Sequence, residues 1–534
     1  MGSATLSTAI ALLPILVLLG LLGSRRARAH EAALAGLVTA LLVAVLGIGM
    51  PAGLAGRAAL LGAAYGLFPI GWILINVLAL YRLTVARGHF AVVQTSIAMV
   101  TTDRRLQLVL VAFCFGAFFE GAAGFGTPVA VTAAILIGLG FPALEASVYS
   151  LIANTAPVAF GALGTPLLAL QGVTGLDLRA LSAMVGYQLP VFSVIVPVWL
   201  VAAYDGWRGV RETWPALLVA GLAFALPQHL VAVHHGPWLV DVVASVCAMT
   251  ALTLFLRRWR PRPNRTDSAP VEAAPISARS APPDRATFWR AWTPWAILTL
   301  VVFAWGTPTV KAFLNGLSAP NLPVAGLHQA VLRVAPVVPT PSPEGAIYVV
   351  NWLSATGTGI LVATLIGAFV MGCGPRDLLR AYVQTLRDLR LALLTIAAMM
   401  ALGYVTRYSG TDTILGLAFA RTGVWYPFFG TLLGWLGVAL TGSDTSSNVL
   451  FGGLQVVTAQ QVGVDPTLMA AANSSGGVMG KMIDAQSIVV AGAATGEAGT
   501  EGLILRRVLW HSLALASLVG LWVLLQARFG VALP

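Results

Sequence analysis

Long apolar runs alternate with short polar or basic segments along the whole chain. Many runs approach the ~20 residues that an α-helix needs to cross a bilayer, and the shorter ones predict half-helices or re-entrant arms. We therefore expect an all-α, polytopic membrane protein with about 12–14 membrane segments. The runs cover residues 7–23, 32–50, 58–80, 106–119, 129–141, 146–170, 181–203, 213–233, 237–256, 291–307, 357–373, 391–405, 425–441 and 508–526.

The composition supports this class. Hydrophobic residues make up 58% of the 534 positions and charged residues only 10%, against roughly 45–50% and 25% in soluble domains. Three cysteines and seven histidines are scattered, so we expect no disulfide framework, metal site or cofactor. The first run has no basic residue before it and several arginines directly after it, which favours an uncleaved helix over a signal peptide.

Basic residues gather between the apolar runs. Of 31 Lys and Arg, 23 fall in six segments, and such clustering predicts cytoplasmic loops and an N-terminus on the outside. The net charge of +11 is thus a topology signal with some attraction for anionic lipid, and no nucleic-acid partner is expected. The segments are residues 24–31, 82–105, 204–212, 257–290, 375–390 and 506–507.

Two distant stretches share one pattern of small and polar residues. Gly121 opens a Gly-rich stretch and is followed 33 residues later by Asn154, and Gly442 opens a Ser/Thr-rich stretch and is followed 31 residues later by Asn473. When the match is extended along the chain, the positions of the arginines give the two matching halves opposite orientations in the membrane. An inverted repeat of this kind is typical of secondary transporters.

The repeat predicts an organisation for the whole chain. We expect N-terminal helices at 1–57, a first inverted repeat at 58–203, connecting helices at 204–256, a flexible cytoplasmic linker at 257–290, helices at 291–384 that carry an irregular external Pro-rich loop at 308–346, and a second inverted repeat at 385–534.

The polar stretches predict a re-entrant hairpin and a broken helix in each repeat, facing each other near the midplane. Helix ends exposed there carry unpaired N–H groups that can hold a small carboxylate. Alternatively, the polar side chains only bond freed backbone groups or pack helices together. The candidate substrate-binding residues are Phe125, Gly126, Thr127, Asn154, Thr155, Ser443, Thr445, Ser446, Ser447, Asn448, Asn473, Ser474, Ser475 and Lys481.

Charged residues at the breaks are candidates for ion coupling. Glu120 and Asp444 each sit at one break, where a carboxyl group can gain and lose a proton during transport, or act as a permanently ionised cap. Lys481 either attracts a substrate anion or pairs with Asp444 or Asp484. Arg407 is either a vestibule charge or an interfacial anchor.

The motifs at these breaks resemble the L-lactate permease family. The resemblance rests on residues 119–128 (FEGAAGFGTP), 152–161 (IANTAPVAFG), 434–437 (GWLG), 441–448 (TGSDTSSN) and 472–481 (ANSSGGVMGK), and it covers nearly the whole chain. It implies a bacterial cytoplasmic (inner) membrane permease that imports L-lactate, D-lactate or glycolate with protons, and distant kinship with elevator-like carriers. Residues 483–486 (IDAQ) depart from the expected pattern at Asp484.

Other functions remain open at this point. A sodium-coupled carboxylate transporter would use the same Asn, Ser and Thr groups, and an anion channel would need a continuous polar pore. No catalytic constellation of an intramembrane enzyme is visible, so we do not expect an enzyme. A homodimer is possible.

Overall fold

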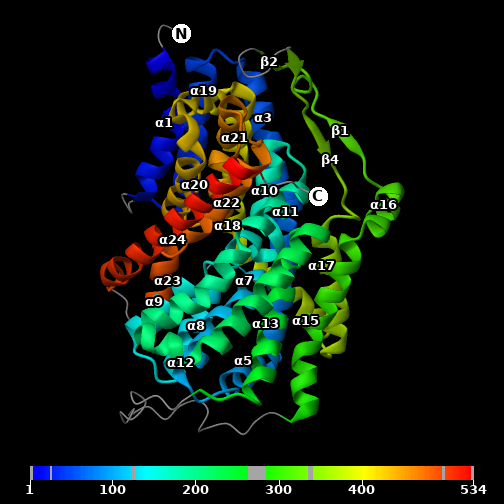
Figure 1. The fold of residues 1–534 in the computed structure, drawn as a ribbon. Coiled ribbons are helices and arrows are strands. Elements are labelled where there is room, and N and C mark those ends of the chain that lie inside the picture. The colour runs from blue at the N-terminus through cyan, green and yellow to red at the C-terminus, as the bar shows by residue number, and fades with distance from the viewer. Residues whose placement is uncertain are drawn as a thin grey trace.

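The computed structural model describes residues 4–23, 27–122, 124, 127–261, 284–334, 341–495 and 500–530. These residues are overwhelmingly helical (Figure 1). In the first half the elements are α1 Ala4–Gly23, α2 Ala29–Leu42, η1 Val43–Gly47, α3 Ala52–Tyr65, η2 Gly66–Gly71, α4 Trp72–Ala86, α5 His89–Ala98, α6 Arg104–Leu108, η3 Val109–Phe115, α7 Gly116–Ala122, α8 Thr127–Gly138, α9 Ala143–Ala153, η4 Val158–Phe160, α10 Gly161–Thr174, α11 Leu178–Gln188, α12 Pro190–His234 and α13 Val240–Leu256.

The second half begins after the linker. Its elements are α15 Arg285–Gly306, α16 Pro308–Leu317, β1 Asn321–Pro323, β2 Leu332–Arg333, β3 Ser342–Pro343, β4 Ile347–Val349, α17 Thr356–Val370, α18 Pro375–Ser409, α19 Thr411–Phe419, η6 Ala420–Trp425, α20 Tyr426–Thr441, α21 Asp444–Val462, α22 Pro466–Gly480, α23 Ala485–Thr495 and α24 Glu501–Phe529. The central residues of the predicted linker, 262–283, lie outside the described residues.

Within the described residues, seven helices are long and apolar enough to cross a membrane, or nine if two sharply bent helix pairs each count as one span. Four more apolar helices have 10–17 residues, too few for a full span. These observations confirm the prediction of an all-α multi-pass membrane protein. One of these, Pro128–Gly138, comes from the short run 129–141, whereas Val240–Leu256 comes from the longer run 237–256.

The predicted loops at 375–390 and 506–507 are wrong, because these residues lie inside α18 and α24. The predicted loop at 204–212 is also wrong, because α12 continues as helix through it. The helix is broken only at Gly206, whose φ of 66° and ψ of −171° suit glycine. Arg208, Arg211 and Glu212 follow the break on the next helical turns, so their charge marked a polar helix surface and not a loop.

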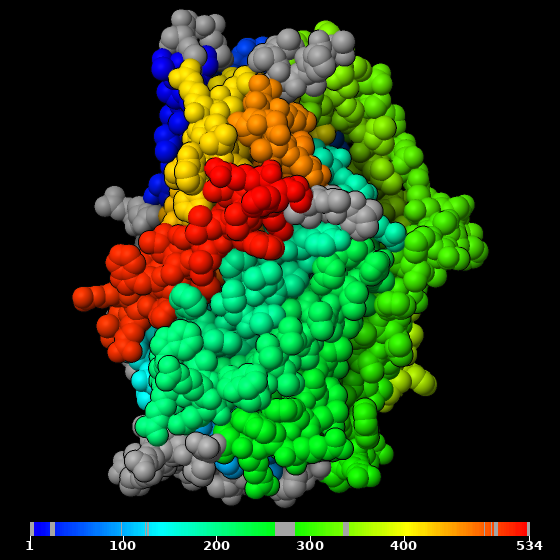
Figure 2. Space-filling model, in the orientation of Figure 1, coloured from blue at the N-terminus to red at the C-terminus, as the bar shows by residue number. Residues whose placement is uncertain are grey.

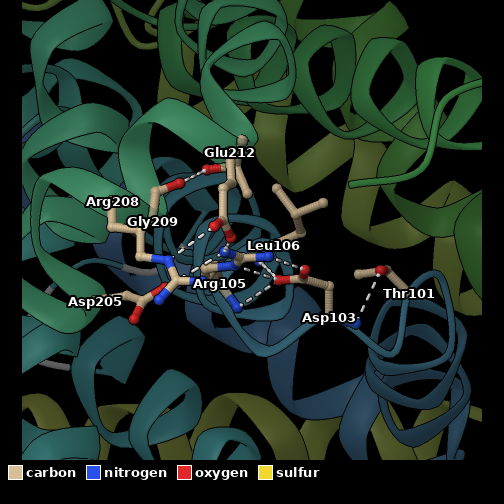
Figure 3. A network of polar contacts seen from close by, with 9 residues as sticks. Thr101, Asp103, Arg105, Leu106, Asp205, Arg208, Gly209 and Glu212 are labelled. Atoms are coloured by element: carbon tan, nitrogen blue, oxygen red, sulfur yellow. Dashed lines mark hydrogen bonds and ion pairs between the residues drawn. The ribbon is translucent and has the colours of Figure 1, made fainter. Parts of the chain in front are cut away.

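A buried arginine braces this break (Figure 3). The Arg105 side chain is fully buried, and its nitrogens lie 2.8 Å from Asp103, 3.4 Å from Asp205 and 2.7 Å from Glu212. Asp103 also caps α6 by accepting from the backbone N–H of Arg105. The network therefore ties the start of α6 to both sides of the break in α12.

The Pro-rich segment 308–346, called the cap below, is more ordered than the irregular loop that the sequence predicts. It contains the amphipathic helix α16 and two antiparallel strand pairs, β1 with β4 and β2 with β3. Asn321 pairs with Val349, and Leu332 pairs with Pro343. Figure 1 shows β1, β4 and α16 together along one side of the molecule, and residues 335–340 lie outside the described part.

The helices that flank the polar breaks pack in reciprocal pairs. Helix α10 packs against α21 and α8 against α23, while α11 packs against α22 and α9 against α24. Helices α20 and α22 cross closely at glycines, because a Cβ on Gly434 or Gly480 would collide with backbone atoms of the facing helix. This packing positions the site described next.

Candidate functional site

Both predicted breaks are interruptions between helices. In the first half, α7 ends at Ala122 and α8 begins at Thr127, and α9 gives way after Ala153 to α10, with a bend of 66°. In the second half, α20 ends at Thr441, Gly442 adopts a left-handed φ of 73°, and α22 ends at Gly480 before α23. Helix ends therefore occur at all four polar motifs.

Glu120 and Asn154 form the polar centre of the first half. The Asn154 side-chain amide donates to Glu120 Oε2 at 3.1 Å, and both side chains are buried. A Cβ on Gly161 would come within 2.5 Å of Glu120 Oε1. The glycine at the start of α10 therefore makes room for the carboxyl group.

The turn that opens α10 is strained. Ala162, Leu163 and Gly164 have φ angles of 43°, 55° and 80°, although L-residues rarely adopt left-handed conformations in succession. Gly164 also lies so close to Pro237 that a Cβ would meet it at 2.7 Å. Strain of this kind concentrates at functional sites and is held in place by surrounding packing.

Asp444 is the centre of the second half. Ser474 Oγ donates to Asp444 Oδ2 at 2.5 Å, and Asn448 donates to the same oxygen at 3.4 Å. Asn473 in turn donates to Asn448 Oδ1 at 3.0 Å and accepts from Gln455 at 3.1 Å. The two motifs of this half therefore form one buried hydrogen-bonded network.

The two halves meet at this network. Asn448 on α21 donates to the Pro166 carbonyl on α10 at 3.2 Å. Lys481 donates to the Gly442 carbonyl at 2.7 Å and lies 3.2 Å from Asp484 Oδ2. Of the alternatives for Lys481, the geometry therefore shows pairing with Asp484.

Several buried polar atoms at the site have no hydrogen-bond partner among the described residues. They are Asn154 Oδ1, Asp444 Oδ1 and Ser475 Oγ. A buried polar group without a partner costs about 1–3 kcal/mol. Such a concentration of unpaired atoms is typical of a site that receives a ligand or an ion.

Other predicted residues bond to the backbone. Thr155 donates to the Ile152 carbonyl, Ser447 donates to the Gly434 carbonyl, and Ser443 caps α21 by accepting from the Ser446 N–H. These contacts fit the alternative in which hydroxyl groups bond freed backbone groups. Thr445 and Ser446 are buried beside Asp444.

Three predicted residues at the first hairpin cannot be placed. Phe125 and Gly126 lie outside the described residues, and of Thr127 only the backbone, at the start of α8, is described. Their roles stay predictions.

Asp241 was missed by the sequence reasoning. It lies in the first turn of α13, is 1% exposed, and has no hydrogen-bond partner for either carboxyl oxygen among the described residues. A Cβ on Gly121, the neighbour of Glu120, would meet Asp241 Cβ at 2.7 Å. The sequence does contain an indication of its importance, because a charged residue inside an apolar run such as 237–256 is a candidate functional residue.

Arg407 anchors the cap. It donates to Glu344 Oε1 at 2.7 Å and to the carbonyls of Gly172 and Val173 at 3.1 and 3.2 Å. These bonds join the cap to α18 and to the end of α10. The geometry favours the anchor alternative over a free vestibule charge.

Comparison with known proteins decides the family. The family model described as L-lactate permease matches residues 7–530. The chain belongs to the L-lactate permease family. The glycolate permease GlcA of Escherichia coli (strain K12) is 46% identical over 99% of this chain and 97% of its own length, and the L-lactate permease of Bacillus subtilis (strain 168) is 44% identical over 98% and 96%.

Members of the L-lactate permease family are named as permeases, so this chain is a membrane transporter and not an enzyme. Among solved structures, the antimetabolite efflux pump MtrF of Neisseria gonorrhoeae aligns with 89% of this chain and 84% of its own at 16% identity and a TM-score of 0.46. A likeness at this level says nothing about the substrate.

Proposed function

We propose that this permease imports L-lactate, D-lactate and glycolate together with protons across the cytoplasmic membrane of a bacterium. The observation that carries the proposal is the pair of buried polar centres, Glu120–Asn154 and Asp444–Ser474, each placed beside the end of an apolar helix. The names of the relatives, a glycolate permease and L-lactate permeases, supply the substrate class.

The unpaired atoms suit a 2-hydroxymonocarboxylate. Ser475 Oγ can donate to the substrate carboxylate, and Asn154 Oδ1 can accept from the 2-hydroxyl group. Lys481 adds a positive charge beside Asp484. The substrate would thus supply hydrogen-bond partners for buried polar atoms that have none among the described residues.

Three buried carboxyl groups can carry the coupling ion. Glu120, Asp444 and Asp241 are buried, and Asp444 and Asp241 have unpaired oxygens. A carboxyl group in such a place holds a proton or a bound cation, because an isolated buried charge is too costly. We favour the proton, and sodium is the alternative that the experiment below separates.

Movement of one half against the other is part of the proposal. The reciprocal packing of α8, α9, α10 and α11 against α23, α24, α21 and α22 supports two inverted repeats related by an axis in the membrane plane. In such an arrangement, rocking or elevator motion exposes one central site alternately to each side.

The test is uptake of labelled L-lactate into proteoliposomes under an imposed proton gradient, and separately under a sodium gradient. We expect accumulation with protons alone, and competition by glycolate but not by citrate. Sodium-driven accumulation would contradict proton coupling, and competition by citrate alone would contradict the substrate.

The Asp444→Asn variant refines this test. We expect it to lose proton-driven accumulation but to keep exchange of labelled for unlabelled lactate, because exchange needs no net proton movement. Asp388→Asn, which changes an exposed carboxyl group, serves as the matched control and should behave like the wild type. Equal accumulation in both variants would remove Asp444 from the coupling mechanism.

A further inference from the structure

A cavity of about 690 Å³ lies between the cap and the helices. Its wall comes from α3, η2, α10, α11, α16, α18 and the chain around β4. Figure 2 shows the cap residues as the green surface along one side of the molecule. The cavity is thus closed on one side by a segment that belongs to neither predicted repeat.

Two cationic side chains line this cavity without a carboxylate partner among the described residues. Lys311, on α16, lies 3.5 Å from the centre of the Trp238 ring, and Arg179 lies at the start of α11. Within the described part of the chain, neither forms an ion pair with a carboxylate, whereas Arg407 is neutralised by Glu344. The charged and titratable groups lining the cavity are Tyr65, Asp177, Arg179, Lys311, Tyr404, Arg407 and Tyr408.

The one carboxylate in the lining is already engaged. Asp177 caps α11 by accepting from the Ala180 N–H at 2.9 Å. Lys311 and Arg179 therefore line the same cavity without a carboxylate bound to either of them among the described residues.

The cavity leads toward the polar network. Leu168 of α10 lines the cavity, and Pro166, two residues earlier on the same helix, accepts a hydrogen bond from Asn448. The part of the cavity at Leu168 is thus within about one helical turn of the network. Small monocarboxylates are far smaller than the cavity, so it suits passage and capture more than a final tight fit.

We propose that Lys311 and Arg179 form an access site that captures a small monocarboxylate anion on the cap side before it reaches the polar network. The inference rests on the proposed function for the chemistry of the anion. Two unpaired cations raise the local concentration of anions and hold a carboxylate by charge-assisted hydrogen bonds. The aromatic face of Trp238 keeps the Lys311 ammonium group in place.

The test measures the KM and Vmax of L-lactate transport in right-side-out and everted membrane vesicles. Lys311→Met combined with Arg179→Gln should raise the KM at least about tenfold for lactate offered from the cap side, because charged hydrogen bonds are lost. Vmax should change little, and the KM from the opposite side should stay at the wild-type value. A structural defect would instead change the kinetics of transport from both sides of the membrane.

The control variants separate charge from folding. Lys311→Arg keeps the charge and should keep the wild-type KM for lactate offered from the cap side. Arg421→Gln removes an exposed positive charge away from the cavity and should leave the KM unchanged.

A wild-type KM in the double variant on the cap side would overturn the access site. If the wild type carries a different monocarboxylate, the proposed function fails at its substrate, and the same KM comparison with that substrate still decides the role of Lys311 and Arg179.

Discussion

Asp241 is the residue whose surroundings demand an explanation. Its carboxyl group is buried at the start of α13, against the turn of α7 that carries Glu120, and both oxygens lack hydrogen-bond partners among the described residues. A purely structural aspartate at a helix start would cap backbone N–H groups. A carboxyl group that carries a proton is neutral, so it does not need the backbone N–H bonds that stabilise an ionised one.

Replacing Asp241 with Asn should remove the pH dependence of lactate uptake and lower proton-driven accumulation at least about tenfold, because the amide has nearly the same shape but cannot bind and release a proton. The measurement is initial uptake between pH 5.5 and 8. Asp465→Asn is the matched control, since Asp465 caps α22 and Asn caps a helix equally well. An unchanged pH profile in Asp241→Asn would exclude it from proton transfer.

The sequence predicted part of the site at this scale. Asp444, Asn448, Asn473 and Ser474 came together as expected, because two polar motifs at helix ends within one repeat must pair with each other when lipid offers no partner. Asp241 could not be paired in this way. Its neighbour Gly121 is 120 residues away in sequence, and only the packing of α13 against α7 brings them together.

Helix crossings at glycine decide how closely the elements pack. Helix α20 carries Gly430 and Gly434, and α22 carries Gly476 and Gly480, each pair spaced by four residues. Cβ atoms at Gly434 and Gly476 would collide with the carbonyls of Asn473 and Thr431. Small residues at this spacing let membrane helices approach closely.

Gly434→Ala should therefore force α20 and α22 apart, lower stability by about 1–3 kcal/mol and reduce transport, because Asn473 moves with α22. Gly53→Ala is the control, since no atom lies within 4 Å of its added Cβ. Thermal unfolding of the detergent-solubilised variants measures stability, and uptake of labelled lactate into proteoliposomes measures transport. Equal melting temperatures would contradict the packing argument.

The Arg105 network makes a second prediction for the elements. Arg105→Met leaves three carboxylates without their shared cation and should cost about 3–5 kcal/mol. Arg208→Met removes a partner of Glu212 whose side chain is 71% exposed and should cost at most about 1 kcal/mol. A comparable loss in both variants, measured by thermal unfolding, would mean that the buried network does not brace α12.

Charge and proline content led to wrong predictions in several segments of the chain. The polar residues after Gly206 indicated a loop, although one glycine with a positive φ lets α12 bend and continue. The strands β1 to β4 have two or three residues each within a Pro-rich segment, too short to show an alternating pattern. Longer apolar helices, whose pattern is strong, were predicted well.

The two predicted repeats give the whole molecule a definite topology. If they are inverted, position 53 at the start of α3 and position 258 after α13 lie on opposite sides of the membrane. The chain offers a simple test, since Cys247 and Cys373 can be replaced and Cys114 is buried.

Single cysteines at Gly53 and Arg258 should then react differently with an impermeant maleimide added to intact cells. We expect labelling of Gly53→Cys, which the arginine distribution places outside, and labelling of Arg258→Cys only after the membrane is opened. Labelling of both from the outside would contradict the predicted topology. Permeabilised cells provide the control for the reactivity of each cysteine.

The unpaired oxygens of the polar centres have a consequence for the evolution of the protein. Asn154, Asp444 and Ser475 hold buried polar atoms without a hydrogen-bond partner among the described residues, so apolar side chains at these positions would make the fold more resistant to heat. Selection for durability and selection for transport therefore oppose each other at the same few atoms. Thermostable variants chosen without regard to activity should accumulate changes there first, and they would be inactive.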